Sequence, residues 1–451
     1  MATMPDGCTP WPDEFAARYR AAGHWRGNTL DTLLRGWAMA YAPRTALVHD
    51  GTRLTYGNLN RRVDRVAAGF RLRGLRAGQR VVVQLPDVPE LVVTAFALMR
   101  VGAAPVFCPL SYRTAEVAHV VRVTEAVGYV GPAVHQGFDH TAMAADIAAR
   151  GPFLRRVFTY EPPAAASPYG GLATDVSGCH YFPLGSVDAP PDAPLARGAG
   201  QVAFFLPSGG APGAPRLVAR THDDYAYQTR AAAEAASLTE DDVYLAAPPA
   251  GPGFASGCPG VVGVLSVGGT VVQAHDPGPA ACLAAVGRER VTVASVASAD
   301  AERWLDVLSA VRSDVSSLRL VQLAGAPVSG AVAERMGRAW GCRLQQVFGR
   351  AEGPLVLTRP AGPDGTALTA RGRPLSPDDE IRIVGPDGAD VPDGETGELL
   401  ARGPYTVRGY YRAPEDDARR FTHDGFFRTG DLARRTPDGD LVMAGRVADA
   451  P

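Results

Sequence analysis

The hydrophobic period changes between helix and strand more than once over residues 54–110, and this alternation constrains the fold more than any other feature of the sequence. Residues 81–85 (VVVQL) form a short apolar run that suits a buried parallel strand. A second amphipathic helix is predicted around residues 91–99, and the apolar residues 104–107 follow it. The first helix lies before residues 81–85 and is indicated by apolar residues at helical spacing, namely Leu59, Val63, Val66, Ala67 and Phe70. Helices that alternate with buried strands predict an α/β architecture.

The alternation resumes over about residues 201–346 and predicts a second α/β subdomain. Residues 161–200 separate the two subdomains, and their abundance of Pro, Ala, Gly and Ser indicates long surface connections. Beyond residue 360 the pattern changes to short alternating runs such as 380–384 and 397–401, punctuated by Pro-Asp-Gly turns. This last part therefore predicts a small antiparallel β subdomain.

Every basic residue among the 45 Lys+Arg is an arginine, and no lysine occurs in the 451 residues. The absence of lysine excludes a Schiff-base lysine and the Walker phosphate loop, whose GxxxxGK[ST] string requires one. With 47 Asp+Glu the net charge is −2, and no basic block is present. Nucleic acid is therefore not expected as the main partner, since phosphate-backbone affinity needs clustered cations. A bound phosphate would have to be held by arginine, backbone N–H groups or a metal.

No segment indicates a membrane or secreted protein. The apolar runs are interrupted by Gly and Pro well before the roughly 18 residues that span a bilayer. The N-terminus carries no readable secretory signal, so a cytoplasmic protein is predicted. The 6 cysteines are dispersed without a C-x-x-C pair, which indicates buried thiols rather than a zinc site or a disulfide framework.

The string LPSGGAPGAPR at residues 206–216 is the most informative candidate for chemistry. It follows an apolar strand and precedes the string THDDY at 221–225. A glycine-dense loop after a strand brings backbone N–H groups close to a phosphate. An ordinary Gly/Pro turn would leave the same pattern, so the string by itself leaves both readings open.

Further strings follow it in a fixed order: QQVFGRAEG at 345–353, RTGD at 428–431 and GR at 445–446, with LTY at 54–56 near the start. Together these strings resemble the adenylate-forming superfamily of acyl- and aryl-CoA ligases and peptide-synthetase adenylation domains. Within it the chain is most similar to 2,3-dihydroxybenzoate–AMP and salicylate–AMP ligases, over about residues 10–449.

The resemblance implies the large N-terminal lobe of these enzymes. Residues 1–355 would form the paired α/β subdomains, and residues 356–445 a small, β-barrel-like antiparallel subdomain. Residues 446–451 would be a hinge stub, with Ala448 at the usual hinge charge. Since the chain stops where the family hinge begins, we expect the C-terminal lid domain to be absent. In the family, that lid supplies the lysine that bridges the carboxylate and the α-phosphate of ATP.

The resemblance also assigns roles around ATP. Glu352 matches the acid that orients Mg²⁺, Arg216 the phosphate cation, and Asp431 the acceptor of the ribose hydroxyls. Arg446 would lie near the ribose and phosphate. The glycine-rich loop and the adenine site complete the implied nucleotide-binding set, namely Ser208, Gly209, Gly210, Gly213, Gly325, Ala326, Phe348 and Gly349. The residue types suit the chemistry, because a hard dication takes oxygen ligands and a flat base takes an apolar slot. Taken singly, Asp431 could be a turn residue and Glu352 a helix-start acid.

The implied pocket for the carboxylic acid contains Gly253, Phe254 and Cys258. Family members carry His-Asn before the aromatic residue, and the Asn binds the ortho substituent of the aryl acid. Gly253 in its place leaves space for a different or larger ortho group. Cys at position 258 goes with salicylate in the family, although a small buried hydrophobe would also explain Cys258.

Several departures from the family fall on the ATP chemistry. Ala211-Pro212 replaces two hydroxyl residues, and proline offers no N–H donor. Arg216 replaces a lysine, which keeps the charge but not the compact geometry. Pro252-Gly253 replaces His-Asn, and Pro327 stands where related ligases have a lysine.

Two functions therefore stand. The first is an aryl-acid-activating core that binds ATP or AMP with Mg²⁺ at a weakened phosphate site, acts on a salicylate, aminobenzoate or hydroxyanthranilate, and works with a lid, carrier protein or second ligase. The acceptor would be coenzyme A or a carrier-protein phosphopantetheine thiol. The second is a repurposed core that binds or transfers an aryl-acyl group made elsewhere, with a pseudoenzyme as a weaker variant. Serine hydrolase chemistry is disfavoured because no G-x-S-x-G string occurs.

Overall fold

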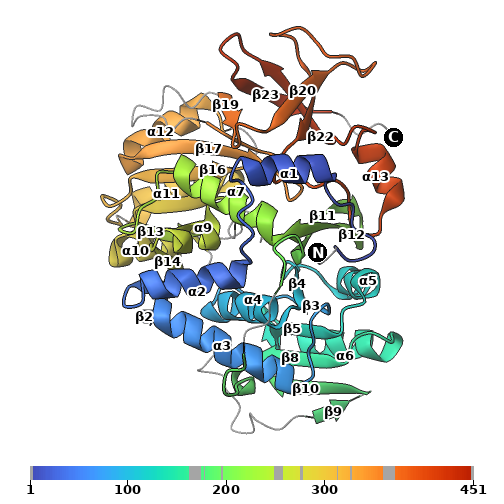
Figure 1. The fold of residues 1–451 in the computed structure, drawn as a ribbon. Coiled ribbons are helices and arrows are strands. Elements are labelled where there is room, and N and C mark those ends of the chain that lie inside the picture. The colour runs from blue at the N-terminus through green and yellow to red at the C-terminus, as the bar shows by residue number, and fades with distance from the viewer. Residues whose placement is uncertain are drawn as a thin grey trace.

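The structure is a computed structural model that describes residues 4–161, 174–176, 178–193, 197–247, 257–274, 278–311, 313–325, 328–358 and 371–447. The described residues form two large sheets, which Figure 1 shows with their flanking helices. A two-stranded sheet of β6 (Val134–His135) and β7 (Phe138–Asp139) lies beside the first.

The first sheet is built mainly from parallel strands with helices on both faces. Its strand order is β12 (Ala214–Thr221), β11 (Val202–Ala211), β4 (Ala104–Phe107), β3 (Arg80–Val83), β5 (Gly128–Pro132), β8 (Arg156–Tyr160), β10 (Cys179–Pro183) and β9 (Thr174–Val176). In β3, Val81 and Val83 pack with α3 (Tyr56–Leu72) and α4 (Pro89–Val101). Val82 packs on the other face with α5 (Thr114–Thr124) and α6 (His140–Arg150). A strand buried on both faces needs a continuous apolar run, which is what this segment has.

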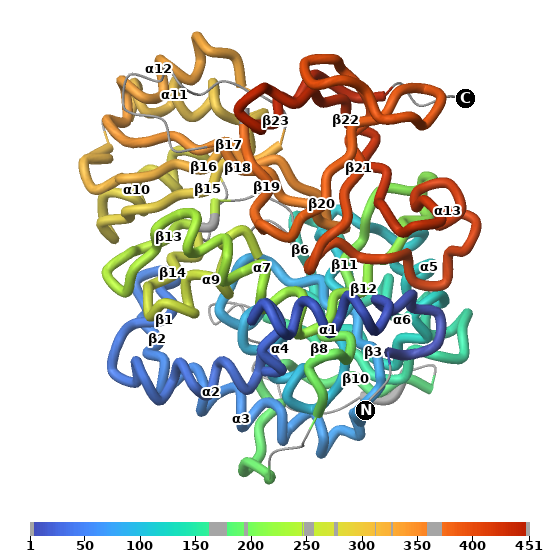
Figure 2. Tube along the Cα trace, turned by 45° about the horizontal axis from the view of Figure 1, so that its top comes forward, coloured from blue at the N-terminus to red at the C-terminus, as the bar shows by residue number. Residues whose placement is uncertain are grey.

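The second sheet begins with parallel strands and continues into the small antiparallel subdomain. Its order is β2 (Thr52–Thr55), β1 (Thr45–His49), β14 (Thr270–Gln273), β13 (Val243–Ala246), β15 (Val293–Ala297), β16 (Leu320–Ala324), β17 (Arg343–Gly349), β18 (Leu355–Leu357), β19 (Arg371–Pro374), β23 (Leu441–Arg446), β22 (Phe427–Arg435), β21 (Gly397–Arg402) and β20 (Glu380–Val384). Strands β1 and β13 to β17 are joined in parallel, whereas β17 onward pairs antiparallel. In Figure 2, β18 and β19 lead from the parallel part into the small subdomain.

Helices cover the parallel part of this sheet on one face. Trp304 and Met336, from α11 (Ala301–Val311) and α12 (Gly330–Trp340), pack there with α10 (Pro279–Glu289). The apolar residues on the opposite face belong to the same hydrophobic core as the first sheet and α9 (Gly260–Ser266). Ligands bind at the carboxyl ends of the strands in open α/β sheets. In this sheet the carboxyl ends of β16 and β17 lead directly into the segments that carry Gly325 and Glu352.

The N-terminal segment ties the α/β part to the small β subdomain. Figure 1 shows α1 (Asp13–Ala21) lying between α7 (His222–Ala235) and these strands. The Trp25 indole Nε1 donates a hydrogen bond to the Pro404 carbonyl at 2.9 Å, and Trp11 Nε1 donates to the Gly403 carbonyl at 3.4 Å. Both indoles are buried, so these hydrogen bonds hold the small β subdomain against the N-terminal segment.

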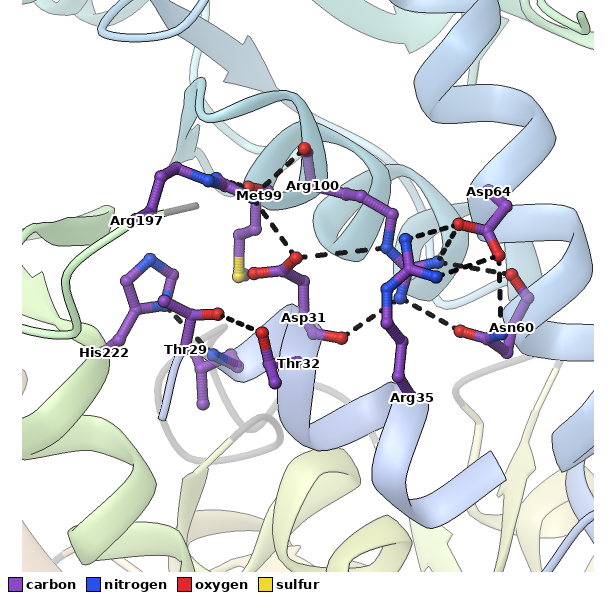
Figure 3. A network of polar contacts seen from close by, with 11 residues as sticks. Thr29, Asp31, Thr32, Arg35, Asn60, Asp64, Met99, Arg100, Arg197 and His222 are labelled. Atoms are coloured by element: carbon purple, nitrogen blue, oxygen red, sulfur yellow. Dashed lines mark hydrogen bonds and ion pairs between the residues drawn. The ribbon is translucent and has the colours of Figure 1, made fainter. Parts of the chain in front are cut away.

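A buried charged network joins the helices that cover the first sheet, and Figure 3 shows it from close by. Asp31 of α2 (Leu30–Ala40) pairs with Arg197 at 3.2 Å, and Arg100 of α4 pairs with Asp64 of α3 at 3.0 Å. Arg197 also donates to the carbonyls of Met99 and Arg100 at the end of α4. These pairs hold α2, α3 and α4 together.

The predicted elements agree with the structure where the apolar runs are uninterrupted. Residues 104–107 coincide with β4, the helix predicted from residue 59 to 70 lies inside α3, and residues 380–384 coincide with β20. The prediction that residues 161–200 are surface connections is wrong for β10, which runs parallel to β8 with Cys179 fully buried. The Pro- and Ala-rich composition around this short strand concealed it. The domain limits at 355 and 445 stay predictions, and β18 spans the first of them.

Candidate functional site

The glycine-dense string folds as a tight β-hairpin rather than an open loop. Strands β11 and β12 pair up to Ala211 and Ala214, so Pro212 and Gly213 alone make the turn. Gly213 has φ +76°, a left-handed conformation that favours glycine. The pairing register shifts between Ser208 and Gly210. This β-bulge leaves backbone groups near the glycines outside the regular ladder of inter-strand hydrogen bonds.

Glu352 lies on the segment between β17 and β18 and is only 2% exposed. The Ser208 hydroxyl donates a hydrogen bond to Glu352 Oε1, and the Tyr410 hydroxyl donates to the same oxygen at 2.7 Å. Burial, and then the charge of Glu352, raise the pKa of Tyr410, so the phenol stays a donor. The hairpin is thus joined to the predicted metal-orienting acid by a direct side-chain contact.

Arg216 lies opposite Ser208 in the hairpin, and its guanidinium lies near Tyr410 and Asp416. Its guanidinium carbon lies 4.9 Å from the centre of the Tyr410 ring, and Nη1 lies 3.3 Å from Asp416 of α13 (Pro414–Arg420). The buried Nε makes no hydrogen bond among the described residues. A planar guanidinium can stack on an aromatic ring, and the Tyr410 ring holds the Arg216 guanidinium in this position.

Asp431 of β22 accepts two hydrogen bonds from Arg350, a residue that the sequence analysis did not single out. Arg350 Nη2 donates to Oδ1 at 2.7 Å and Nε donates to Oδ2 at 3.0 Å. Burial lowers the pKa of Arg350, but the bonds and charge of Asp431 raise it overall, so the guanidinium stays charged. Arg446, opposite Asp431 in register on β23, approaches Oδ1 at 3.6 Å.

One cavity of about 1040 Å³ brings most of these residues together. Its wall includes Ser208, Gly209, Gly210, Arg216, Glu352 and Arg446. Seven arginines and four carboxylates line it among the described residues, which gives a surplus of positive charge. Low-dielectric walls with one sign of charge concentrate ions of the other sign, so this cavity suits a polyanion such as a polyphosphate.

The remaining predicted nucleotide residues lie outside this wall. Gly213 borders an adjoining cavity of about 660 Å³ between α5, α6 and the hairpin turn. Phe348 is mostly buried at the end of β17 and packs with Val356 and Leu399. A Cβ at Gly349 would lie 2.2 Å from the end of the Leu355 side chain, so a larger residue there would require Leu355 to shift. Gly325 follows β16 with φ +110°, and Ala326 lies outside the described residues, as does Pro327.

The predicted acid pocket is only partly described. Gly253 and Phe254 lie outside the described residues, together with Pro252. Cys258 is 1% exposed and packs with aromatic residues of the N-terminal segment. Burial raises the pKa of its thiol to about 12, so the group is neutral and unsuited to act as a nucleophile.

Arg220 is a second residue whose importance the sequence analysis did not state. It is almost fully buried at the end of β12 and pairs with Asp224 of α7 at 2.8 Å. It also donates to the Ala351 carbonyl at 3.1 Å and to the Gln228 side chain at 2.7 Å. Gln228 in turn donates to the Gly257 carbonyl at 2.9 Å. Arg220 therefore links the segment that carries Glu352 to the segment that carries Cys258. The sequence signal was the capping box that Thr221 and Asp224 form at the start of α7.

Magnesium fits the site only together with a phosphate ligand. Among the described residues no group of three His, Cys, Asp or Glu side chains could hold a metal ion. Both donors to Glu352 reach Oε1, which leaves Oε2 for a cation. Mg²⁺ usually binds through one or two carboxylates plus substrate phosphates and water, and a single carboxylate beside a phosphate hairpin matches that pattern.

Comparison with known proteins decides the family. The family model described as AMP-binding enzyme matches residues 34–411. The chain belongs to this family. It is 44% identical over 453 residues to the 2-hydroxy-7-methoxy-5-methyl-1-naphthoate–CoA ligase of Streptomyces carzinostaticus, covering 99% of this chain and 80% of that one. It is 43% identical over 448 residues to the salicyl-AMP ligase / salicyl-S-ArCP synthetase of Mycobacterium tuberculosis, covering 98% and 77%.

A solved structure confirms the predicted fold class. The apo structure of MbtA from Mycobacterium smegmatis superposes with a TM-score of 0.88 at 40% identity, covering 98% of this chain and 80% of that one. The predicted resemblance to the adenylate-forming superfamily, and within it to aryl acid–AMP ligases, is also confirmed. Among the described residues, no helix has the length and apolar character that a membrane span requires.

Proposed function

We propose that the protein activates an aryl carboxylic acid with ATP. An oxygen of the aryl carboxylate would attack the α-phosphorus, the bond from that phosphorus to the bridging oxygen of the β-phosphate would break, and aryl-AMP and pyrophosphate would result. The observation that supports this most is the meeting of the Ser208–Gly210 hairpin strand, Arg216, Glu352 and Arg446 on one positively charged cavity. The relatives are named as ligases of aryl acids, which supports the substrate class.

The contacts suggest how these residues would share the work. The hairpin and Arg216 would hold the β- and γ-phosphates, and Asp431 would accept the ribose hydroxyls. Mg²⁺, when bound with ATP, would neutralise phosphate charge, and Glu352 is the carboxylate placed to hold it. Ser208 and Tyr410 keep Glu352 fixed through Oε1, so its free oxygen has a defined direction.

The acid is proposed to be a substituted benzoate of the salicylate, aminobenzoate or hydroxyanthranilate type. Gly253 leaves more space than the Asn of related ligases, and a relative named for a naphthoate shows that larger aryl acids occur among these enzymes. The acyl group would pass to coenzyme A or to a carrier-protein thiol, and a relative named salicyl-S-ArCP synthetase supports the second. We further propose that full activity requires a lid domain or a partner protein.

Pyrophosphate exchange tests this proposal. The protein would be assayed for acid-dependent exchange of pyrophosphate into ATP with salicylate, 2-aminobenzoate, 3-hydroxy-2-aminobenzoate and 1-naphthoate, alone and with the C-terminal domain of a relative added. Octanoate serves as the non-aryl control. We expect exchange with at least one aryl acid, lowered about 10²–10³-fold by Glu352→Ala. Exchange with none of the aryl acids under either condition would refute the proposal.

A second function is favoured by the hairpin turn. Ala211 and Pro212 carry no hydroxyl, so two phosphate donors are missing where the β- and γ-phosphates would bind, and Pro212 offers no N–H either. A protein that binds or transfers an aryl-acyl group made elsewhere would not need them. This alternative predicts tight binding of presynthesised salicyl-AMP without ATP, together with undetectable exchange. Salicyl-AMP that binds no better than AMP would exclude it.

A further inference from the structure

Arg350 is paired with Asp431, the carboxylate that the proposed function assigns to the ribose. Two parallel hydrogen bonds join the guanidinium to both carboxylate oxygens, at 2.7 and 3.0 Å. Such bidentate, charge-assisted pairs are stronger than neutral hydrogen bonds. Both carboxylate oxygens of Asp431 are therefore already engaged by Arg350.

A vicinal diol would bind the carboxylate in the same way. Its two hydroxyls donate in parallel to the two oxygens, so diol and guanidinium compete for one edge of Asp431. Arg446 does not compete in this manner, because its Nε lies 3.6 Å from Oδ1 and its side chain is 70% exposed. A nucleotide must displace Arg350 before Asp431 can accept both ribose hydroxyls.

The displaced side chain would remain inside the cavity. The Gly353 N–H donates to the Arg350 carbonyl at 3.1 Å, which fixes the backbone in a turn, so the side chain alone has to move. Arg350 lines the same cavity wall as Ser208, Gly209 and Glu352. A guanidinium released there meets the phosphate of the nucleotide, which replaces the carboxylate as its partner.

We propose that Arg350 is a nucleotide-specificity residue that holds Asp431 when the site is empty, yields it to the ribose and then binds the nucleotide phosphate. Adenosine must break the Arg350–Asp431 pair without offering a replacement, whereas AMP offers its phosphate. Arg350 therefore makes the site select AMP over adenosine. The inference rests on the nucleotide site of the proposed function and not on the identity of the aryl acid.

The test measures dissociation constants of AMP, adenosine and 2′,3′-dideoxyadenosine by calorimetry for the wild type and Arg350→Met. Methionine has similar length and apolar bulk but no charge. We expect adenosine to bind about tenfold more tightly to the variant and AMP about tenfold more weakly, the size of one charge-assisted hydrogen bond for each. Dideoxyadenosine should show no gain, because it has no diol to compete with Arg350.

Arg428→Met is the matched control. Arg428 lines the same cavity and pairs with Glu398 at 2.8 Å. Among the described residues it makes no hydrogen bond or ion pair with Asp431. We expect the affinity of this variant for adenosine to match that of the wild type. An equal gain in Arg428→Met, or a gain for dideoxyadenosine, would show a general effect of cavity charge and overturn the inference.

The remaining outcomes separate this inference from the proposed function. Equal weakening of AMP and adenosine in Arg350→Met would show that Arg350 merely supports Asp431, and unchanged affinities would show that it has no role. Either result overturns the inference while pyrophosphate exchange with an aryl acid still supports the function. Opposite shifts of AMP and adenosine without any exchange would support the inference and count against the function.

Discussion

Asp379 should make the stability of the protein depend on pH in the neutral range. It lies just before β20, where the small β subdomain meets the N-terminal segment. The Tyr405 hydroxyl and the Ser376 N–H donate to Oδ2 at 2.6 and 3.0 Å, whereas the buried Oδ1 has no hydrogen-bond partner. Burial raises the pKa of Asp379 to about 7, against the opposing effect of these two donors.

The sign follows from linkage. The folded state holds the proton up to about pH 7, while the unfolded chain releases it near pH 4, so folding is favoured below that range and progressively less as pH rises through it. Between pH 5 and pH 8 the wild type should lose about 2.5 kcal/mol of unfolding free energy through this group, from two pKa units at about 1.36 kcal/mol each. Asp379→Asn cannot titrate and should not show this loss.

The assay is urea unfolding of the wild type and Asp379→Asn at pH 5, 6, 7 and 8. We expect the free-energy difference between the two to shift in favour of the variant by about 2.5 kcal/mol over this range, mostly below pH 7. Tyr405→Phe is the directional control, because loss of its donor raises the pKa of Asp379 further and moves the shift to higher pH. A difference that stays constant from pH 5 to pH 8 would refute the assignment.

Three further predictions address the cation at the hairpin, the hairpin turn and the buried network. Arg216→Ala should weaken pyrophosphate binding about 10- to 100-fold in calorimetry, as expected for a lost charge-assisted hydrogen bond, while adenosine binding changes less than twofold; equal losses would place Arg216 elsewhere. Ala211→Ser with Pro212→Thr restores two hydroxyls and one N–H and should tighten ATP binding about tenfold, measured against AMP, which should not change. Asp31→Ala leaves Arg197 and Arg100 buried without their shared acid and should cost about 3–5 kcal/mol in urea unfolding, and a loss below 1 kcal/mol would contradict the network in Figure 3.

The sequence predicts those parts of the fold that depend on local pattern. The apolar runs at 81–85 and 104–107 predict buried strands, and the structure has β3 at Arg80–Val83, which ends two residues before the predicted run does, and β4 at Ala104–Phe107. The hairpin at 206–216 could not be foreseen in detail, since a glycine- and proline-rich string carries no hydrophobic alternation from which a register follows. Strand β10 was missed because five residues within a Pro- and Ala-rich stretch give too short a periodic signal.

In the candidate site, too, residues that lie in local strings can be predicted from the sequence, whereas contacts between distant residues cannot. Glu352 and Asp431 could be singled out because their neighbours form recognisable strings, and their roles stay predictions. The Arg350–Asp431 pair joins residues 81 positions apart and depends on how β22 lies against the end of β17. No local property of Arg350 distinguishes it from the other arginines. Long-range pairing of this kind becomes visible only in the folded structure.

The absence of lysine gains a physical meaning from these contacts. A lysine ammonium is a compact, strongly hydrated charge, whereas a guanidinium is planar and can stack and hydrogen-bond at once. Arg216 uses this by lying against the Tyr410 ring while it pairs with Asp416, and Arg350 uses it by covering both oxygens of Asp431. Arg216 and Arg350 are therefore both engaged by other groups of the protein. In the proposed function, a nucleotide phosphate would have to outcompete these partners, so its binding would exchange one set of ion pairs for another.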